Sequence, residues 1–382
     1  MKFFSSIFNN NRSRRSILLG TGLLSLSICL SSCEPIFDDQ SDCDYGKALR
    51  FIFDYHMEPG ANAFPANVDC VDVLVYDTNG NYVTKFTETS EELRNEGYRM
   101  HMPLDPGTYN LVVWGGTSCE NNTFTLTHST ATGRAAQHDM QVTLNTDEPG
   151  VSKKQLHDID ARTGGLFYGT HTFTIDPDDR SSNGYKEETV NVMKNTNTIQ
   201  VILQELTGDN SVDFKDYTFR IVDDNFVLDA SNVSISTSTA DVTPTYHPHN
   251  SENRTVGYID IEGSKEGTQA EEDAKKPVQV AVAEFSTNRL LMDHIGTARL
   301  LVMSSLEHEA DGSDKTIIDI PLIEYLLLTR GMGENWIKTD QEYLDRQSRW
   351  TMMFFLQRNV WLNTKIVVNS WVVRLNNIDL GW

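Results

Sequence analysis

The sequence has few positive charges, and they do not gather in any one segment. Its 382 residues include 32 Lys and Arg against 54 Asp and Glu, which gives a formal charge of −22. No run of five basic residues occurs. A surface of this sign repels nucleic acid and anionic membrane surfaces. The composition therefore argues against nucleic acid as a partner.

Common enzyme and metal motifs are also missing. The sequence contains no C-x-x-C pair, Walker A motif, G-x-G-x-x-G, G-x-S-x-G or H-E-x-x-H. The close pair His247 and His249 has no further ligand nearby and predicts a surface loop. Asp77 begins an acidic turn, but Tyr82 stands where a calcium loop needs Gly. We expect no catalytic residue, no metal and no cofactor.

One pair of carboxylates is a candidate for acid–base chemistry. Glycosidases use two such groups, and the pair in this sequence is Glu342 and Asp345. The segment 339–346 also predicts a helix, on which the acids pair with Arg346. We favour the structural role and predict that the protein is not an enzyme.

Cysteine is scarce, and one of the five ends an N-terminal segment that has the features of a signal peptide. A basic start precedes an apolar run at Ile17–Leu30, and Leu30-Ser31-Ser32-Cys33 forms a bacterial lipobox. The run has 14 residues, fewer than the about 20 that a transmembrane helix needs. Residues 1–32 are thus predicted to be a lipoprotein signal peptide, and residues 33–46 a lipidated tether.

Lipidation at Cys33 replaces a membrane-spanning helix in this prediction. Each buried methylene contributes about 0.8 kcal/mol, so two or more acyl chains, palmitate among them, anchor a protein stably. The signal segment carries four positive residues and no negative one, so the chain after it has a formal charge near −26.

The remaining cysteines predict a disulfide. An exported compartment permits such bonds, and Cys43, Cys70 and Cys119 leave three possible pairs. We prefer Cys43 with Cys119, because both flank predicted strands.

Helical periodicity is weak, and most apolar residues follow strand patterns. Val71–Tyr76 alternates with period two and meets Asp77-Thr78-Asn79-Gly80, which predicts a hairpin. Similar signals recur at sandwich spacing through residues 47–150, which we assign to an N-terminal β-sandwich domain. Residues 151–382 form the C-terminal β-sandwich domain in this prediction. Asp176–Asp179 predicts a solvated turn within it.

The last apolar segment, Lys365–Leu375, is predicted to be one long strand. An unpaired strand of this kind promotes aggregation unless it is paired or covered. It either completes its own sheet or is offered to a neighbouring subunit by strand addition. The candidate subunit-joint residues on it are Ile366, Val368, Trp371 and Val373.

These features, taken in order, resemble the fimbrial anchor family of Bacteroidales, the FimB-type subunits of type V pili. The segments that carry the resemblance are the lipobox, Val73–Gly80, Gly107–Tyr109, Trp114–Gly116, Leu166–Gly169, Gln341–Arg346, Phe354–Leu356, Trp361 and Ile366–Trp371. The acidic residues after the lipobox resemble surface-export signals of this bacterial group: Glu34, Asp38, Asp39 and Asp42.

The resemblance implies an all-β fold of two tandem transthyretin-like β-sandwich domains. It also implies an outer-membrane lipoprotein, exposed on the cell surface, that anchors a fimbrium and ends its assembly without catalysis. The implied partners are stalk or accessory pilin subunits. Stalk pilins of this superfamily lose their lipid and first strand when a protease cuts after a basic residue in the loop that follows.

That loop has no basic residue in this chain. After Arg50, the next Lys or Arg is Lys85, and a cut at Arg50 falls inside the predicted first strand. We therefore expect the lipid to stay attached, which fits an anchor better than a stalk pilin. The alternative is a glycan-binding or adhesive accessory subunit that uses exposed aromatic residues. Trp114, Trp361 and Trp371 lie in strand patterns, however, and are expected to be buried.

Overall fold

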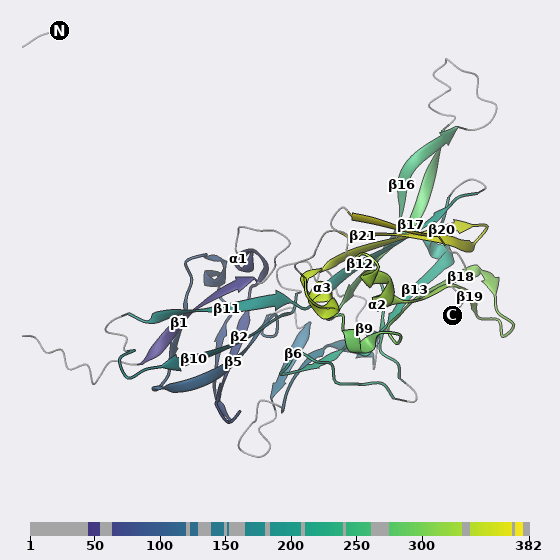
Figure 1. The fold of residues 1–382 in the computed structure, drawn as a ribbon. Helices are drawn as coiled ribbons and strands as arrows, with labels where there is room; N and C mark the ends of the chain where they lie inside the picture. Colours follow the sequence, from purple (N-terminus) through teal and green to yellow (C-terminus); the bar gives the residue numbers. More distant parts are fainter. Residues whose placement is uncertain are drawn as a thin grey trace, which may run out of the picture. The chain divides into compact units, whose positions relative to one another are not determined.

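The computed structural model describes residues 45–53, 63–119, 123–128, 139–148, 151–152, 165–179, 184–207, 211–239, 242–260, 275–330, 337–368 and 371–376 (Figure 1). Cys33 and Cys43 lie outside this part of the chain. Strands dominate it, with three short α-helices among the described residues. The expected all-β fold is confirmed, while the number of transthyretin-like domains stays a prediction.

The first sheet has seven strands in the spatial order β3-β2-β5-β10-β11-β1-β4. They are β1 (Gly46–Phe53), β2 (Val71–Asp77), β3 (Tyr82–Glu88), β4 (Met100–Pro103), β5 (Gly107–Gly115), β10 (Phe167–Ile175) and β11 (Lys186–Lys194). Strands β10 and β11 come from beyond residue 150, where we expected a domain boundary. The domain division stays a prediction, and this pairing favours a boundary after β11.

Strand β2 is buried on both faces. Successive side chains of a strand point to opposite faces of the sheet, and the two sets here enter different hydrophobic clusters. Val71, Val73 and Val75 belong to one cluster, while Leu74 and Tyr76 belong to the other. The first sheet therefore separates two hydrophobic cores.

The predicted hairpin after β2 is confirmed. Strands β2 and β3 pair antiparallel, and Gly80 in the turn has φ +78°, a conformation that favours glycine. Asp77 Oδ1 accepts hydrogen bonds from the backbone N–H groups of Asn79 at 2.8 Å and Asn81 at 2.9 Å. The acidic residue thus closes the turn with its own side chain.

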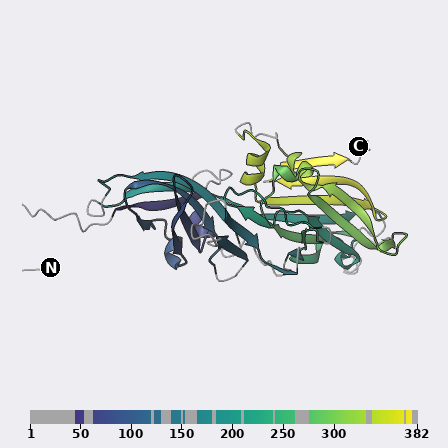
Figure 2. The ribbon, with the colours of Figure 1, turned by 90° about the horizontal axis from the view of Figure 1, so that it is seen from below.

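The rest of the described chain forms three further sheets (Figures 1 and 2). One has the order β16-β17-β12-β20-β21-β22: β12 (Asn197–Glu205), β16 (Asn250–Asp260), β17 (Lys275–Thr287), β20 (Arg349–Gln357), β21 (Val360–Val368) and β22 (Trp371–Asn376). Another has the order β19-β18-β13-β15-β9-β8: β8 (Thr146–Glu148), β9 (Val151–Ser152), β13 (Tyr217–Val222), β15 (Thr245–Tyr246), β18 (Arg299–His308) and β19 (Asp314–Pro321). The smallest has the order β14-β7-β6: β6 (Phe124–His128), β7 (Met140–Leu144) and β14 (Val227–Asp229).

The larger hydrophobic core takes alternate residues of these strands. On β20 the buried side chains are Trp350, Met352, Phe354 and Leu356, with less buried residues between them. On the parallel neighbour β12 the pattern repeats. This period of two is the sequence signal of a sheet with one face in a core.

The predicted helix at 339–346 is confirmed as α3 (Asp340–Arg346). The other two α-helices are α1 (Phe64–Asn67) and α2 (Leu322–Leu327). Helix α3 begins after Thr339, whose Oγ1 accepts a hydrogen bond from the backbone N–H of Glu342 at 3.0 Å. Such a side-chain cap satisfies one of the free N–H groups of the first turn.

The predicted single strand at the C-terminal end is wrong. Lys365–Leu375 is split between β21 and β22, which pair antiparallel as a hairpin. Val368 is opposite Trp371, and Ile366 is opposite Val373. Alternating apolar residues suit both arms of a hairpin as well as one long strand, so the pattern did not reveal the turn. These strands, drawn in yellow in Figure 2, form one edge of their sheet.

Candidate functional site

The first candidate element is β1, which lies inside its sheet. It pairs in parallel with β11, with Arg50 opposite Thr189, and antiparallel with β4, with Leu49 opposite Met100. Arg50 is therefore within a strand that has neighbours on both sides. A protease needs an extended, unpaired segment, so the paired backbone protects the bond after Arg50.

A buried ion pair fastens the start of β1. Lys47 Nζ lies 2.9 Å from Asp179 Oδ2, and the side chains are 6% and 0% exposed. Lys186 contacts the other carboxylate oxygen, and its hydrogen bond is the main cause that holds the pKa of Asp179 well below its ordinary value. Gly46 donates its N–H to the Asp179 carbonyl at 3.2 Å. The expected solvated turn is thus wrong for Asp179, which is buried because two lysines neutralise it.

The second candidate element is the edge of the sheet formed by β22. Among the described strands, β22 pairs only with β21. Of the four candidate joint residues, Ile366 and Val368 lie on β21, while Trp371 and Val373 lie on β22. The structure brings them together as two cross-strand pairs next to an open sheet edge. An open edge presents a row of backbone groups that another strand can pair with.

The disulfide differs from our prediction. Cys119 is bonded to Cys70, with a Cα–Cα distance of 5.4 Å, so the expected pair with Cys43 is wrong. Cys70 directly precedes β2 and Cys119 follows β5, and Val71 is opposite Gly115 where these strands pair. The antiparallel register brings the start of one strand to the end of the other.

The disulfide lies beside a buried carboxylate that sequence reasoning missed. Asp72 is 0% exposed and accepts hydrogen bonds from Thr87 at 2.6 Å, from Thr117 at 2.7 Å and from Ser118. Lys85 Nζ lies 3.1 Å away. Burial raises the pKa of Asp72, but the hydroxyl groups and Lys85 outweigh it, so the pKa lies below its ordinary value. The contacts of this carboxylate therefore link β2 to β3 and to the segment that follows β5.

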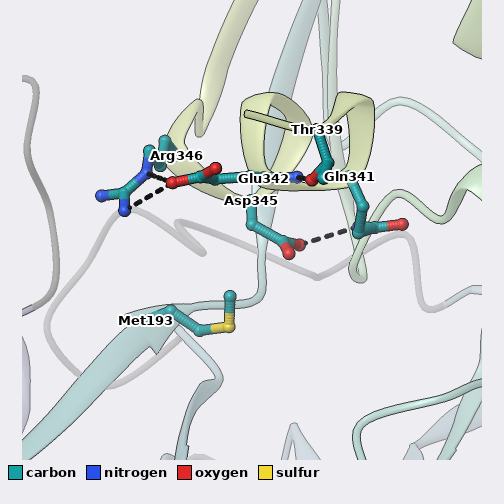
Figure 3. Close-up of a pocket in the computed structure, with 6 residues that line it drawn as sticks. All are labelled: Met193, Thr339, Gln341, Glu342, Asp345 and Arg346. Carbon is teal, nitrogen blue, oxygen red and sulfur yellow. Dashed lines mark hydrogen bonds and ion pairs between the residues drawn. The ribbon is translucent and has the colours of Figure 1, made fainter. Parts of the chain in front are cut away.

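A pocket of about 230 Å³ lies beside helix α3 (Figure 3). Its lining residues are Met193, Thr339, Gln341, Glu342, Asp345 and Arg346. Figure 3 shows Glu342 turned toward Arg346, and their side chains are 2.9 Å apart. Gln341 Nε2 donates a hydrogen bond to Asp345 Oδ1 at 2.9 Å.

The two carboxylates of this pocket are held by different arginines. Asp345 binds Arg289 through two hydrogen bonds, from Nε at 2.8 Å and from Nη2 at 2.7 Å. Glu342 binds Arg346 on its own helix, as expected. Such two-pronged pairing fixes α3 against the loop that carries Arg289. The geometry supports a structural role for both acids.

Aromatic residues are mainly internal in the described part of the chain. Trp114 is fully buried, as expected, whereas Trp361 is only partly buried against the larger core. The side chain of Trp371 is outside the described set. Among the described residues, none of the exposed large hydrophobic side chains is aromatic.

The sequence matches the model of a known family. The family model of the fimbrillin-A associated anchor proteins Mfa1 and Mfa2 matches residues 40–377. The chain belongs to this family, and it is therefore of the class of fimbrial anchor and accessory subunits.

Solved structures agree with this assignment. A protein of Bacteroides thetaiotaomicron described as a proposed adhesin is 36% identical, with a TM-score of 0.70 over 87% of this chain and 99% of the other. A second protein of that species, described as a proposed polysaccharide-binding protein, is 26% identical, with a TM-score of 0.65 over 87% and 99%. The fimbrial anchor protein Mfa2 of Porphyromonas gingivalis shares the fold at 15% identity, with a TM-score of 0.59 over 87% and 100%. No curated protein matches the chain.

The membrane attachment predicted for the chain lies outside the described residues, because Cys33 precedes them. Within the described part, no helix has the length and apolar character to cross a membrane.

Proposed function

We propose that this chain is an outer-membrane lipoprotein that anchors a fimbrium to the cell surface and ends its assembly there. In this proposal Cys33 carries the acyl chains, residues 33–46 form the tether, and the β-fold binds stalk or accessory pilin subunits. Membership of the anchor family supports this role. Anchoring itself requires no catalysis, cofactor or metal.

The observation that carries the proposal is the position of Arg50. The family resemblance implies that stalk pilins lose their lipid and first strand by a cut after a basic residue in the loop that follows. Here Arg50 lies within β1, where it is opposite Thr189 on β11 and directly follows Leu49, the last residue paired with β4. The next Lys or Arg is Lys85, beyond the loop. A chain that keeps β1 also keeps the lipid. Its first sheet stays complete and offers no groove there to another subunit, so assembly ends.

The joint to the fimbrium is proposed at the edge strand β22. Backbone pairing along an open edge supplies affinity, and alternate side chains supply specificity. Trp371 and Val373 lie on this strand, and Ile366 and Val368 stand opposite them on β21.

Fractionation of cells tests the anchor role. Cells that make the Cys33→Ala variant are expected to release the protein, with its fimbriae, into the medium. Cys43→Ala is the matched control, because it also removes a cysteine before β1 but keeps the lipobox. Membrane retention of Cys33→Ala at the level of the control would refute the anchor role.

The same cells test the joint. A chain that ends after Val368 lacks β22, and we expect it to stay in the membrane fraction without fimbriae. A chain that ends after Asn376 keeps β22 and is the control, expected to retain them. Fimbriae held equally by both truncated chains would place the joint elsewhere.

An adhesive or glycan-binding accessory subunit is the second candidate. The 36% identical relative, described as a proposed adhesin, is the observation in its favour. Intact chain in purified fimbriae, together with binding of the isolated protein to a glycan array, would support it. Release of fimbriae by Cys33→Ala distinguishes the anchor from this second role.

A further inference from the structure

Three side chains far apart in sequence meet at one end of the strands β13 and β14. Ser234 Oγ lies 2.8 Å from Nε2 of His294, and Nδ1 of the same ring contacts Asp223 Oδ1. Asp223 directly follows β13, Ser234 forms an isolated bridge with Leu228 on β14, and His294 ends the 3₁₀ turn Met292–His294. The contacts thus run from a hydroxyl to an imidazole to a carboxylate, the arrangement of nucleophile, base and acid in a serine hydrolase.

The exposure of these groups increases in the order that catalysis requires. Asp223 is 2% exposed, the His294 side chain is 13% exposed, and Ser234 is half-buried. An orienting carboxylate works best when it is buried, while a nucleophile must be reached by its substrate.

The buried carboxylate fixes the orientation of the imidazole ring. A carboxylate accepts a hydrogen bond from Nδ1–H, so the neutral ring presents the lone pair of Nε2 to the hydroxyl of Ser234. The hydrogen bond with Asp223 is the main cause that raises the pKa of His294 above its ordinary value. The other acidic groups that act on the ring are Asp224 and Asp293.

Exposed apolar side chains adjoin Ser234 and His294 in the sequence. Val233 and Ile295, the chain neighbours of Ser234 and His294, are 42% and 46% exposed. Two backbone hydrogen bonds form the β-bridge between Ser234 and Leu228. Asp229 N–H donates to the Val233 carbonyl, and Ile235 N–H donates to the carbonyl of Val227. Neither bond uses the N–H of Ser234, which points away from β14 in this arrangement. A nucleophile's own N–H is a usual oxyanion donor.

We propose that Ser234 and His294 form an acyl-transfer site that hydrolyses small carboxylic esters, with Asp223 as the residue that positions His294. Ser234 Oγ attacks the ester carbonyl carbon while its proton moves to Nε2. The bond to the alkoxy group then breaks, and Nε2–H protonates the leaving alcohol. Water attacks the acyl-serine in the same way, which releases the carboxylic acid and restores Ser234. The activity is additional to anchoring and independent of Cys33.

A fluorophosphonate probe tests the nucleophile, because an activated serine displaces its fluoride and forms an oxygen–phosphorus bond. We expect labelling of the full-length mature protein at Ser234, mapped by peptide mass spectrometry, and none in Ser234→Ala. Ser236→Ala is the matched control, since Ser236 bonds Asp224 and not His294. It is expected to label at the rate of the unmodified protein.

Two further variants separate catalysis from structure. His294→Gln is expected to label at least about 100-fold more slowly, the size of a general-base contribution. Asp223→Asn is expected to label more slowly and to move the inflection of the pH–rate profile to lower pH, because the ring loses its carboxylate. Thermal melting of each variant checks that it is folded. Absence of label at Ser234, or an unchanged rate in folded His294→Gln, overturns the proposal.

Discussion

The ion pair between Lys47 and Asp179 predicts how firmly β1 is held. Replacement of Lys47 by Met keeps most of the apolar stem of the side chain but removes the charge. Asp179 then stays buried with one cation fewer. Loss of one partner from a buried pair costs roughly 3–5 kcal/mol. Lys186 still contacts Asp179, and the Asp176 N–H still donates to it at 3.0 Å, so we expect about 2–3 kcal/mol.

The assay follows cleavage at one peptide bond. An arginine-specific protease cuts after Arg50 only when β1 opens, and mass spectrometry quantifies the loss of that bond over time. A cost of about 2–3 kcal/mol on opening corresponds to roughly 30- to 150-fold faster cleavage, provided that β1 recloses faster than it is cut. Urea unfolding measures the same change in global stability.

A matched control is Lys315→Met. Lys315 also pairs with a carboxylate, that of Glu307, but both side chains are about 40% exposed. Exposed pairs contribute little, so this variant is expected to keep the cleavage rate and stability of the unmodified protein. Equal cleavage after Arg50 in Lys47→Met and Lys315→Met would refute the idea that the buried pair holds β1.

Two other predictions concern the neighbourhood of the disulfide. Replacement of Cys70 and Cys119 by Ser opens a loop of 49 residues and is expected to lower the free energy of unfolding by about 2–4 kcal/mol in urea titrations; an unchanged midpoint would contradict it. The pKa of Asp72 lies below its ordinary value when folded, so its stabilising contribution is present above about pH 4 and is lost as the pH falls through the folded pKa. Asp72→Asn is therefore expected to be less stable at pH 7 and to lose less stability between pH 5 and pH 3; parallel pH curves for the two proteins would contradict this.

Local structure was predictable where neighbouring residues decide it. The turn at Asp77–Asn81 depends on one side chain and one glycine, both within five residues. The helix α3 depends on Thr339 as its cap and on a pair between Glu342 and Arg346, four residues apart. Such contacts are visible in the sequence because their partners are close along the chain.

The errors arose where the partner is distant. Asp179 was expected in solvent because it lies in an acidic turn, but Lys47, more than one hundred residues earlier, reaches it through the pairing of β1 with β11. The partner of Cys119 depends on the register of β2 against β5. Period-two alternation shows which face of a strand is buried, but it does not show which strand pairs with it.

The interior position of β1 also has a mechanical consequence. If the lipid is on Cys33, a pull on the fimbrium reaches the membrane through the chain before Gly46, and so it runs along the axis of β1. The hydrogen bonds to β11 and β4 cross that axis, so the pull shears both rows at once instead of opening them one bond at a time. Resistance to such a pull depends on the unfolding rate and not on equilibrium stability. In the proposed anchor, the strand whose retention keeps the lipid is then also the element that bears the tension on the fimbrium.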